Sequence, residues 1–287
     1  MTDTIPGILF HRDAEAAEVP LVFDSPHSGT IYPEDFRFAC PLDVLRTAED
    51  TYVEELYGAA SAHGATLLAA LFPRSYLDVN REVADIDPDL LDGPWPGLLN
   101  PGEKTRLGLG LVRRLAKPGM PVYDRKLSVA EVQARIARCY EPYHAALQAA
   151  CDRLHRKFGV VWHVDCHSMP SEGNAMSTDP GAHRADFVLG DRDGTTCDPA
   201  LTDFVGRVLR GRGYSVKVND PYKGVELVRR HGRPAEGRHS LQIEVNRALY
   251  MDEKTLVKTA GFDRLKADIT HLIEALANFA DPKQVRE

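Results

Sequence analysis

The chain is predicted to adopt an α/β fold, in which helices cover both faces of a central mixed, largely parallel sheet. Short apolar segments typical of buried strands recur along the sequence, at 21–23, 65–71, 160–164, 187–189, 214–218 and 241–245. Longer segments with helical periodicity lie between and after them, at 128–158, 199–210 and 252–279. This alternation indicates a three-layer sandwich, because both apolar faces of the sheet must be covered. Within 128–158, Pro142 is expected to break the helix.

A single domain is expected for residues 1–287. With 43% hydrophobic residues, a chain of 287 residues can bury a full core. The formal net charge of −7 predicts no nucleic-acid surface, and the apolar runs are far shorter than the roughly 18 residues that cross a membrane. Five cysteines without Cys-x-x-Cys spacing, and an N-terminus without a secretion signal, predict a protein of the reducing cytoplasm.

The most informative segment is Val160–Met169, an apolar run that ends in Asp165-Cys166-His167-Ser168. Ends of buried strands are where α/β folds place their ligand sites. Alternate residues of an extended strand share a face, so His163, Asp165 and His167 are expected to lie on one side. These three side chains indicate a metal or catalytic site. The alternative is a pair of histidines with ordinary structural hydrogen bonds.

A second apolar segment, Pro20–Phe23, leads into the turn Ser25-Pro26-His27-Ser28-Gly29. His27 and His167 can meet if their strands are adjacent and parallel, and neutral imidazole is a common zinc ligand. A catalytic zinc ion takes a third protein ligand, often a carboxylate. Asp24 precedes His27 within the strand and is expected to point away from such a site.

Asp50 is the candidate for the third ligand. Thr51 and Glu54 have the spacing of a capping box, which predicts a helix that begins at Thr51 and places Asp50 just ahead of it. The alternative role for Asp50 is a favourable interaction with the dipole of that helix.

The region from Ala84 to Lys126 is a loop-rich excursion from this pattern. It contains Asp-Pro, Gly-Pro-Trp-Pro-Gly, Asn-Pro-Gly and Lys-Pro-Gly-Met-Pro. Long loops in compact domains are commonly lids, binding loops or disordered segments, and Trp95 predicts a packed anchor within this one. Gly108-Leu109-Gly110 lacks the third glycine of a dinucleotide-binding turn. If this excursion borders a pocket, it bears on which substrate the protein binds more than on the metal chemistry.

Together these segments resemble the N-formylglutamate amidohydrolase family, whose members carry a Pro-His-Ser/Ala-Gly turn, an Asp ahead of the first helix and an Asp-x-His-Ser strand end. The resemblance runs from about Leu21 to Met251 and includes further motifs at 77–81, 142–144, 187–190, 223–224, 230–234 and 241–245. The family is in turn similar to the zinc carboxypeptidase and aminoacylase superfamily. The resemblance implies a zinc-exopeptidase-like fold and one divalent metal, expected to be Zn²⁺. It also implies His27, Asp50 and His167 as the ligands and Glu244 as the catalytic base.

The residue chemistry agrees with these implied roles. Alternation along Ser240–Asn246 puts Glu244 on one face of a largely apolar strand, where we expect it to be partly buried. An ion pair with a neighbouring arginine is the alternative for this carboxylate. Asp165 is expected to orient a ligand imidazole by accepting its other N–H. His163 is the fallback ligand, because it shares the strand face of His167.

A substrate that carries carboxylates requires fixed cations, and arginine can hold a carboxylate through two parallel hydrogen bonds. Arg81 is the leading candidate, because it follows an expected strand end and the family places an Asn-Arg pair there. Asn80 could donate to a substrate carboxylate or to a developing oxyanion. Arg229 and Arg230 are the second choice. The alternative for each arginine is a solvated surface charge.

The predicted function is metal-dependent hydrolysis of an N-acyl amino acid, foremost N-formyl-L-glutamate, a small acidic substrate, with release of formate. The alternatives are another N-acyl amino acid, a carboxypeptidase-like substrate, or a metal- or ligand-binding protein without catalysis. Glu244 favours an enzyme, because binding alone requires no general base. Hydrolysis through Ser28 or Ser168 is disfavoured, since neither lies in a Gly-x-Ser-x-Gly turn.

Overall fold

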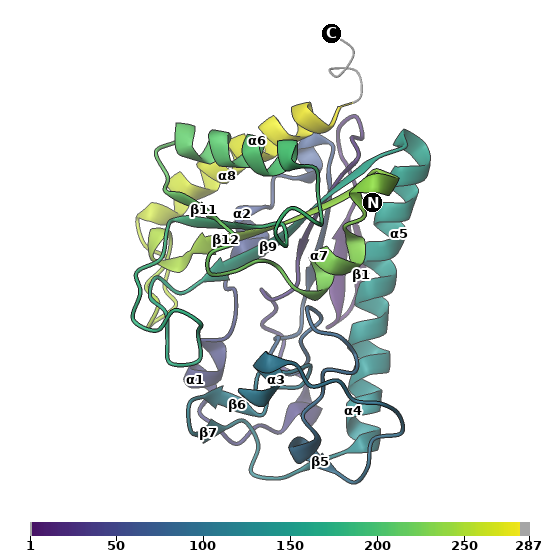
Figure 1. The fold of residues 1–287 in the computed structure, drawn as a ribbon, viewed down its shortest axis with the longest axis vertical. Coiled ribbons are helices and arrows are strands. Elements are labelled where there is room, and N and C mark those ends of the chain that lie inside the picture. Colours follow the sequence, from purple (N-terminus) through teal and green to yellow (C-terminus); the bar gives the residue numbers. More distant parts are fainter. Residues whose placement is uncertain (1, 282–287) are drawn as a thin grey trace.

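The computed structural model describes residues 2–281, which form a central sheet with helices on both faces (Figure 1). Eight strands run in the order β1-β2-β4-β3-β9-β12-β10-β11. Their bounds are Thr2–Ile5 (β1), Leu9–Arg12 (β2), Leu21–Ser25 (β3), Thr66–Ala70 (β4), Val161–Met169 (β9), Phe187–Gly190 (β10), Val216–Val218 (β11) and Arg238–Asn246 (β12). The central strands β4, β3, β9 and β12 are parallel, whereas β2 and β10 join them antiparallel. The predicted mixed, largely parallel sheet is confirmed.

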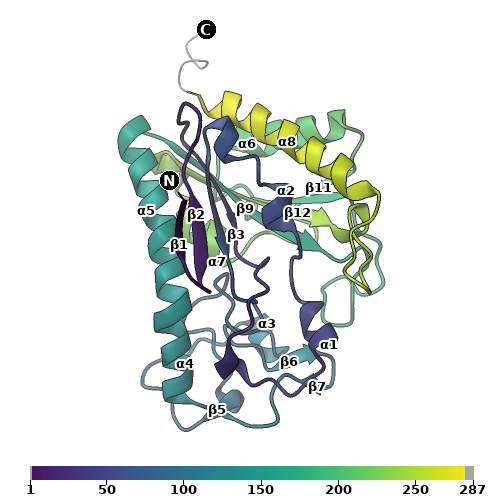
Figure 2. The ribbon, with the colours of Figure 1, turned by 180° about the vertical axis from the view of Figure 1, so that it is seen from behind.

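Helices cover the two faces because strand residues alternate between two apolar clusters. Val22 faces the cluster that contains residues of α5 (Glu141–Phe158) and α7 (Glu226–His231). Leu21 and Phe23 face the opposite cluster, built with three further helices: α2 (Val53–Leu56), α6 (Pro199–Gly211) and α8 (Gly261–Ala280). Figure 2 shows α5 on one side of the sheet and α6 and α8 on the other. Burial on both faces explains why the strand at 21–23 is apolar throughout.

Two of the expected helices differ in extent from the structure. The segment 128–158 forms α4 (Val129–Arg135), a π-helical turn at Ile136–Tyr140, and then α5. Pro142 therefore follows a π-helical turn and does not end the helix, consistent with its missing N–H donor. The segment 252–279 becomes helical only at Gly261, because the Asp252 side chain accepts from the backbone N–H groups of Lys254 and Thr255 and closes a turn.

The excursion at 84–126 is packed against the rest of the protein. It contains α3 (Glu103–Arg106) and three short strands: β5 (Leu91–Asp92), β6 (Leu115–Lys117) and β7 (Met120–Pro121). β5 pairs with β8, which spans Leu127–Ser128 just after the excursion. The helix α1 lies earlier in the chain and spans Leu42–Arg46. Ile86, Leu111 and Val122 are fully buried, and Trp95 packs against the core as predicted. In the described part of the chain, we find no helix long and apolar enough to cross a membrane.

Candidate functional site

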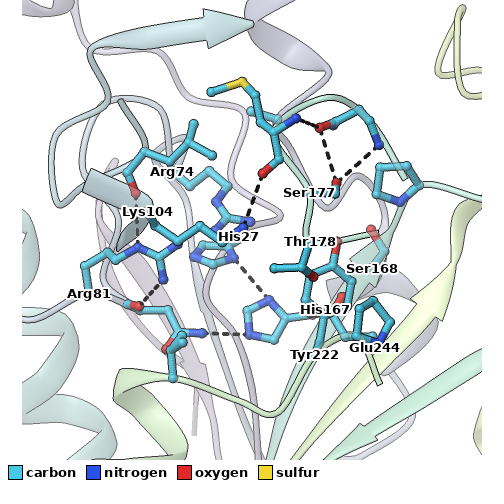
Figure 3. A pocket seen from close by; sticks show the side chains of 18 of the residues that line it. His27, Arg74, Arg81, Lys104, His167, Ser168, Ser177, Thr178, Tyr222 and Glu244 are labelled. Carbon is cyan, nitrogen blue, oxygen red and sulfur yellow. Dashed lines mark hydrogen bonds between the residues drawn. The ribbon is translucent and has the colours of Figure 1, made fainter. Parts of the chain in front are cut away.

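The carboxyl ends of three parallel strands bring the predicted site residues to one edge of the sheet. β3 leads into the turn that carries His27, β9 carries His167 near its end, and β12 carries Glu244 directly beside His167 in the strand register. Figure 3 shows these three side chains converging on one cavity. Adjacent parallel strands thus assemble residues from three distant parts of the sequence.

Three buried side chains present potential metal-ligand atoms to one another. The Nδ1 atoms of His27 and His167 are 3.1 Å apart, and Oδ2 of Asp50 lies 3.0 Å from His167 Nδ1 and 3.4 Å from His27 Nδ1. Each of the three residues is at most 3% exposed. Facing imidazole nitrogens at this separation require a shared proton or a cation between them. The group could therefore hold a metal ion.

The outward-facing atom of each of these residues is held by a charged partner. His27 Nε2 lies 2.7 Å from Asp78 Oδ1, and His167 Nε2 lies 2.7 Å from Asp165 Oδ1. Arg247 donates to Asp50 Oδ1 at 2.9 Å. Carboxylates behind ligand imidazoles orient the rings and raise their basicity. The arrangement therefore directs the three remaining donor atoms to a common point.

Electrostatics keep the Asp50 and Asp78 carboxylates ionised, whereas burial raises the pKa of Asp165. Burial acts to raise the pKa of Asp50, but hydrogen bonds from His167 and His27 outweigh it and hold that pKa well below its usual range. Burial is likewise outweighed at Asp78, whose pKa is lowered well below its usual range by the neighbouring Arg74. The pKa of His167 is raised despite burial, because Asp165 and Asp50 stabilise its charged form.

Asp50 is placed by tertiary contacts and not by a helix start at Thr51, so that expectation is wrong. The helix α2 begins at Val53, and Tyr52 ahead of it has a left-handed backbone with φ of 70°. Thr51 makes no capping hydrogen bond to the helix, because its hydroxyl donates to Glu49. The backbone N–H of Asp50 instead donates to the carbonyl of His27 at 3.0 Å. This bond fixes Asp50 beside the His27 turn.

Glu244 is buried against His167 and Gln242. Gln242 Nε2 donates to Glu244 Oε1 at 3.1 Å. No cation lies within ion-pair distance of this carboxylate among residues 2–281, so the ion-pair alternative does not describe it. Burial raises its pKa to about 7, only partly offset by the positive charge on His167. A carboxylate with this pKa can accept and release a proton near neutral pH.

The cavity beside these residues has a volume of about 510 Å³ and is strongly basic. Six of the residues that line it are arginines or lysines: Arg74, Arg81, Lys104, Arg113, Lys223 and Arg247. Among the described residues that line it, Glu103 and Glu244 alone carry carboxylates. A protein with net negative charge therefore concentrates positive charge here, which suits a small anionic ligand.

The predicted substrate-binding residues divide between the cavity and its surroundings. Arg81 lines the cavity, where its guanidinium donates to the carbonyls of Leu109 and Asn80. Asn80 also lines it, with its amide nitrogen 3.1 Å from His167 Nε2. Arg229 is not brought to the cavity, because Glu226 and Glu82 bind its guanidinium at 2.6 and 2.8 Å.

The fallback ligand His163 is also not brought to the cluster of His27, Asp50 and His167. Its two ring nitrogens contact Asp24 and Ser240, each at 2.7 Å, in a buried network below the site. Asp24 points away from the ligand cluster, as expected, and accepts a further hydrogen bond from Tyr143. Asp165, in contrast, lies behind His167 where the sequence prediction put it.

Several residues of the site were not predicted, among them Arg247, which binds Asp50, and the three that follow. Asp78 belongs to the motif at 77–81, but only its neighbours Asn80 and Arg81 had been assigned roles. Arg74 contacts Asp78 at 2.8 Å and approaches Asp50 to 3.9 Å, and Arg113 reaches the cavity from the excursion. The Asp-x-Asn-Arg spacing could have drawn attention to Asp78. We find no comparable local signal for Arg74 or Arg113.

Comparisons with known proteins agree with this geometry. A family model described as N-formylglutamate amidohydrolase matches residues 19–251. N-formylglutamate deformylase from Pseudomonas putida is 30% identical over 249 residues, which cover 85% of each chain. Its counterpart from Pseudomonas aeruginosa is 29% identical over 265 residues, or 90% of this chain and 92% of that protein.

A solved structure is similar over nearly the whole chain. The crystal structure of N-formylglutamate amidohydrolase from Ralstonia eutropha JMP134 has a TM-score of 0.93 and 52% sequence identity to this protein. The match covers 96% of this chain and 98% of that one.

Proposed function

The chain belongs to the N-formylglutamate amidohydrolase family, and we propose that it hydrolyses N-formyl-L-glutamate to formate and L-glutamate with one bound divalent metal ion, Zn²⁺. The observation that carries this proposal is the spacing of 3.0, 3.1 and 3.4 Å among the three ligand atoms. Zinc bonds of about 2.0–2.1 Å in a tetrahedral site separate neighbouring ligands by about 3.3 Å. The five free buried cysteines agree with a place in the reducing cytoplasm.

His27, Asp50 and His167 would hold the ion. When bound, the ion would polarise the formyl carbonyl and lower the pKa of a water molecule. Asp78 and Asp165 keep the two imidazoles in the orientation that binding requires.

We assign the proton transfer to Glu244. Its carboxylate accepts a proton from the attacking water as the new C–O bond forms. It then returns that proton to the amide nitrogen as the C–N bond breaks, so that the amino group of glutamate can leave. Gln242 holds Oε1 of Glu244, while Oε2 has no hydrogen-bond partner among residues 2–281 and is available for this transfer.

We assign the α-carboxylate of the substrate to Arg81. That carboxylate lies only two bonds from the amide nitrogen, so its partner must lie close to the ligand cluster. Arg81 directly follows Asn80, whose side chain contacts His167. The guanidinium of Arg81 has no carboxylate partner among the described residues, which leaves its charge available to a ligand.

The proposed function is tested by measuring formate and amine release from N-formyl-L-glutamate, with N-acetyl- and N-succinyl-L-glutamate as competing substrates. Purified protein is supplied with one equivalent of zinc, and its metal content is measured in the same sample. We expect the N-formyl substrate to be hydrolysed fastest. Faster hydrolysis of the N-acetyl or N-succinyl compound would show that the proposed substrate is wrong. Binding of N-formyl-L-glutamate without release of formate from any preparation would indicate a ligand-binding protein.

A further inference from the structure

The cavity contains more positive charge than the protein itself neutralises. Arg74 and Arg247 are ion-paired with Asp78 and Asp50, and Lys223 is ion-paired with Asp193. The other three cations that line the cavity, Arg81, Lys104 and Arg113, have no carboxylate within 4.0 Å among residues 2–281. A ligand with more than one negative charge would complete this arrangement.

Arg113 is the most unusual of these three cations. It is only 9% exposed, and its Nε atom is buried without a hydrogen-bond partner. Arg81 and Lys104, in contrast, each donate to a backbone carbonyl, of Leu109 and Met176 respectively. A buried guanidinium without an anion destabilises a fold, so its presence at a cavity wall points to a ligand that supplies the anion.

The surroundings of Arg113 agree with this interpretation. Burial and the nearby charge of Arg74 lower its pKa to about 9. Arg113 lies at one end of a tight turn, where its backbone bridges to Leu109. This turn belongs to the excursion at 84–126, whereas Arg81 follows the segment that contacts both ligand histidines. The two arginines therefore reach the cavity from different parts of the fold.

We propose that Arg113 binds the side-chain carboxylate of the substrate and thereby selects acyl-amino acids with an acidic side chain. The inference rests on the proposed function, and it assigns the second carboxylate of N-formyl-L-glutamate. Arg81 is already assigned to the α-carboxylate, and the two carboxylates are separated by three carbon atoms, so a second cation is required. Arg113 meets this requirement, because it is buried, lines the same cavity and has no other anionic partner.

Three substrates distinguish the role of Arg113 from that of Arg81. N-formyl-L-glutamine lacks the side-chain charge, and 4-formamidobutanoate lacks the α-carboxylate but keeps the other one. For Arg113→Gln we expect kcat/KM to fall roughly 10- to 100-fold on N-formyl-L-glutamate and on 4-formamidobutanoate, as for loss of a charged hydrogen-bonded contact. On N-formyl-L-glutamine the expected change is less than about threefold. An equal fall in kcat/KM of Arg113→Gln on all three substrates would overturn the proposal. An unchanged kcat/KM on 4-formamidobutanoate would also overturn it.

A matched control and a stability measurement exclude a merely structural role. Arg114→Gln removes the neighbouring arginine, which is ion-paired with Asp87 and does not line the cavity, and it should leave kcat/KM unchanged on all three substrates. Without ligand, Arg113→Gln should unfold at the same temperature as the wild type or at a higher one, because it removes an unpaired buried charge. A lower melting temperature together with a loss on every substrate would show that Arg113 supports the fold instead.

Failure of the proposed function has a different signature. Wild-type protein that releases no formate from any of the three substrates would refute the proposed reaction. The thermal shift produced by glutarate, a plain dicarboxylate, then tests Arg113 separately. Glutarate should raise the melting temperature of the wild type and Arg114→Gln but not of Arg113→Gln. An equal shift in all three proteins would overturn the role of Arg113.

Discussion

Substitution of Asp78 by Asn should weaken metal binding although Asp78 is not itself a proposed ligand. Asp78 is fully buried, with Oδ1 2.7 Å from His27 Nε2 and Oδ2 2.8 Å from Arg74. Asparagine can still accept the hydrogen bond from His27, but it removes the negative charge that raises the basicity of the ring. Its amide N–H₂ group would also face the Arg74 guanidinium where Oδ2 now accepts.

Loss of a carboxylate behind a ligand histidine typically weakens metal binding about 10- to 100-fold, or about 1.4–2.7 kcal/mol. Zinc affinity is measured by competition with a chromophoric chelator at fixed pH. Asp268→Asn is the matched control, because Asp268 is also buried and paired with an arginine, Arg212, but its partners among the described residues include no ligand histidine. An Asp78→Asn affinity within twofold of the wild type, in a folded variant, would refute the reasoning.

Three further predictions concern catalysis, binding and stability. Glu244→Gln should retain zinc while kcat falls about 10²- to 10⁴-fold, and parallel loss of metal would make Glu244 a ligand instead of the base. Arg81→Lys should weaken binding of N-formyl-L-glutamate by about 1–3 kcal/mol, measured as a higher KM, with metal content unchanged. Unaltered kinetics would show that another cation binds the α-carboxylate. Burial opposes ionisation of Asp268, but hydrogen bonds from Tyr214 and Arg212 outweigh it and lower the pKa of this carboxylate. The ionised carboxylate therefore stabilises the fold at pH values above its unfolded pKa of about 3.9. Asp268→Asn should therefore destabilise the protein by about 1 kcal/mol at pH 7, and the difference should disappear as pH falls through the folded pKa; a difference that persists at low pH would exclude this charge effect.

The sequence was sufficient to predict the sheet and the strand-end histidines, because both follow from local pattern and one topological rule. His27 and His167 each follow an apolar strand, and parallel neighbouring strands end at the same edge. Asp165 could be placed behind His167 because alternate residues on a strand share a face. These inferences require no knowledge of distant contacts.

The remaining site residues depend on contacts that local sequence does not encode. Asp78 meets His27 across 51 positions of sequence, and Arg247 meets Asp50 across 197. Thr51 and Glu54 have the spacing of a capping box, yet the left-handed backbone of Tyr52 prevents a helix from starting there. In that segment the fixed position of Asp50 prevails over local helix propensity.

Arg229 is a residue that the sequence predicts for substrate binding but that the structure does not bring to the cavity. As a basic residue in a family motif it was a reasonable candidate for substrate binding, but Glu226 lies one helical turn before it and captures its guanidinium. Arg113 lies in no family motif, although it is the more buried of the two. The two arginines differ in whether a carboxylate already neutralises their charge. The pairing of Arg229 with Glu226 is local, whereas its pairing with Glu82 and the burial of Arg113 depend on tertiary structure.

The most direct test of the account is to add zinc back to chelator-treated protein while following formate release from N-formyl-L-glutamate. The three ligand atoms of His27, Asp50 and His167 form one site, so activity should be negligible without metal, rise linearly and reach a plateau at one zinc per chain. Full activity in protein shown to be free of metal, or no formate release at any zinc concentration, would contradict the central claim of a metal-dependent deformylase.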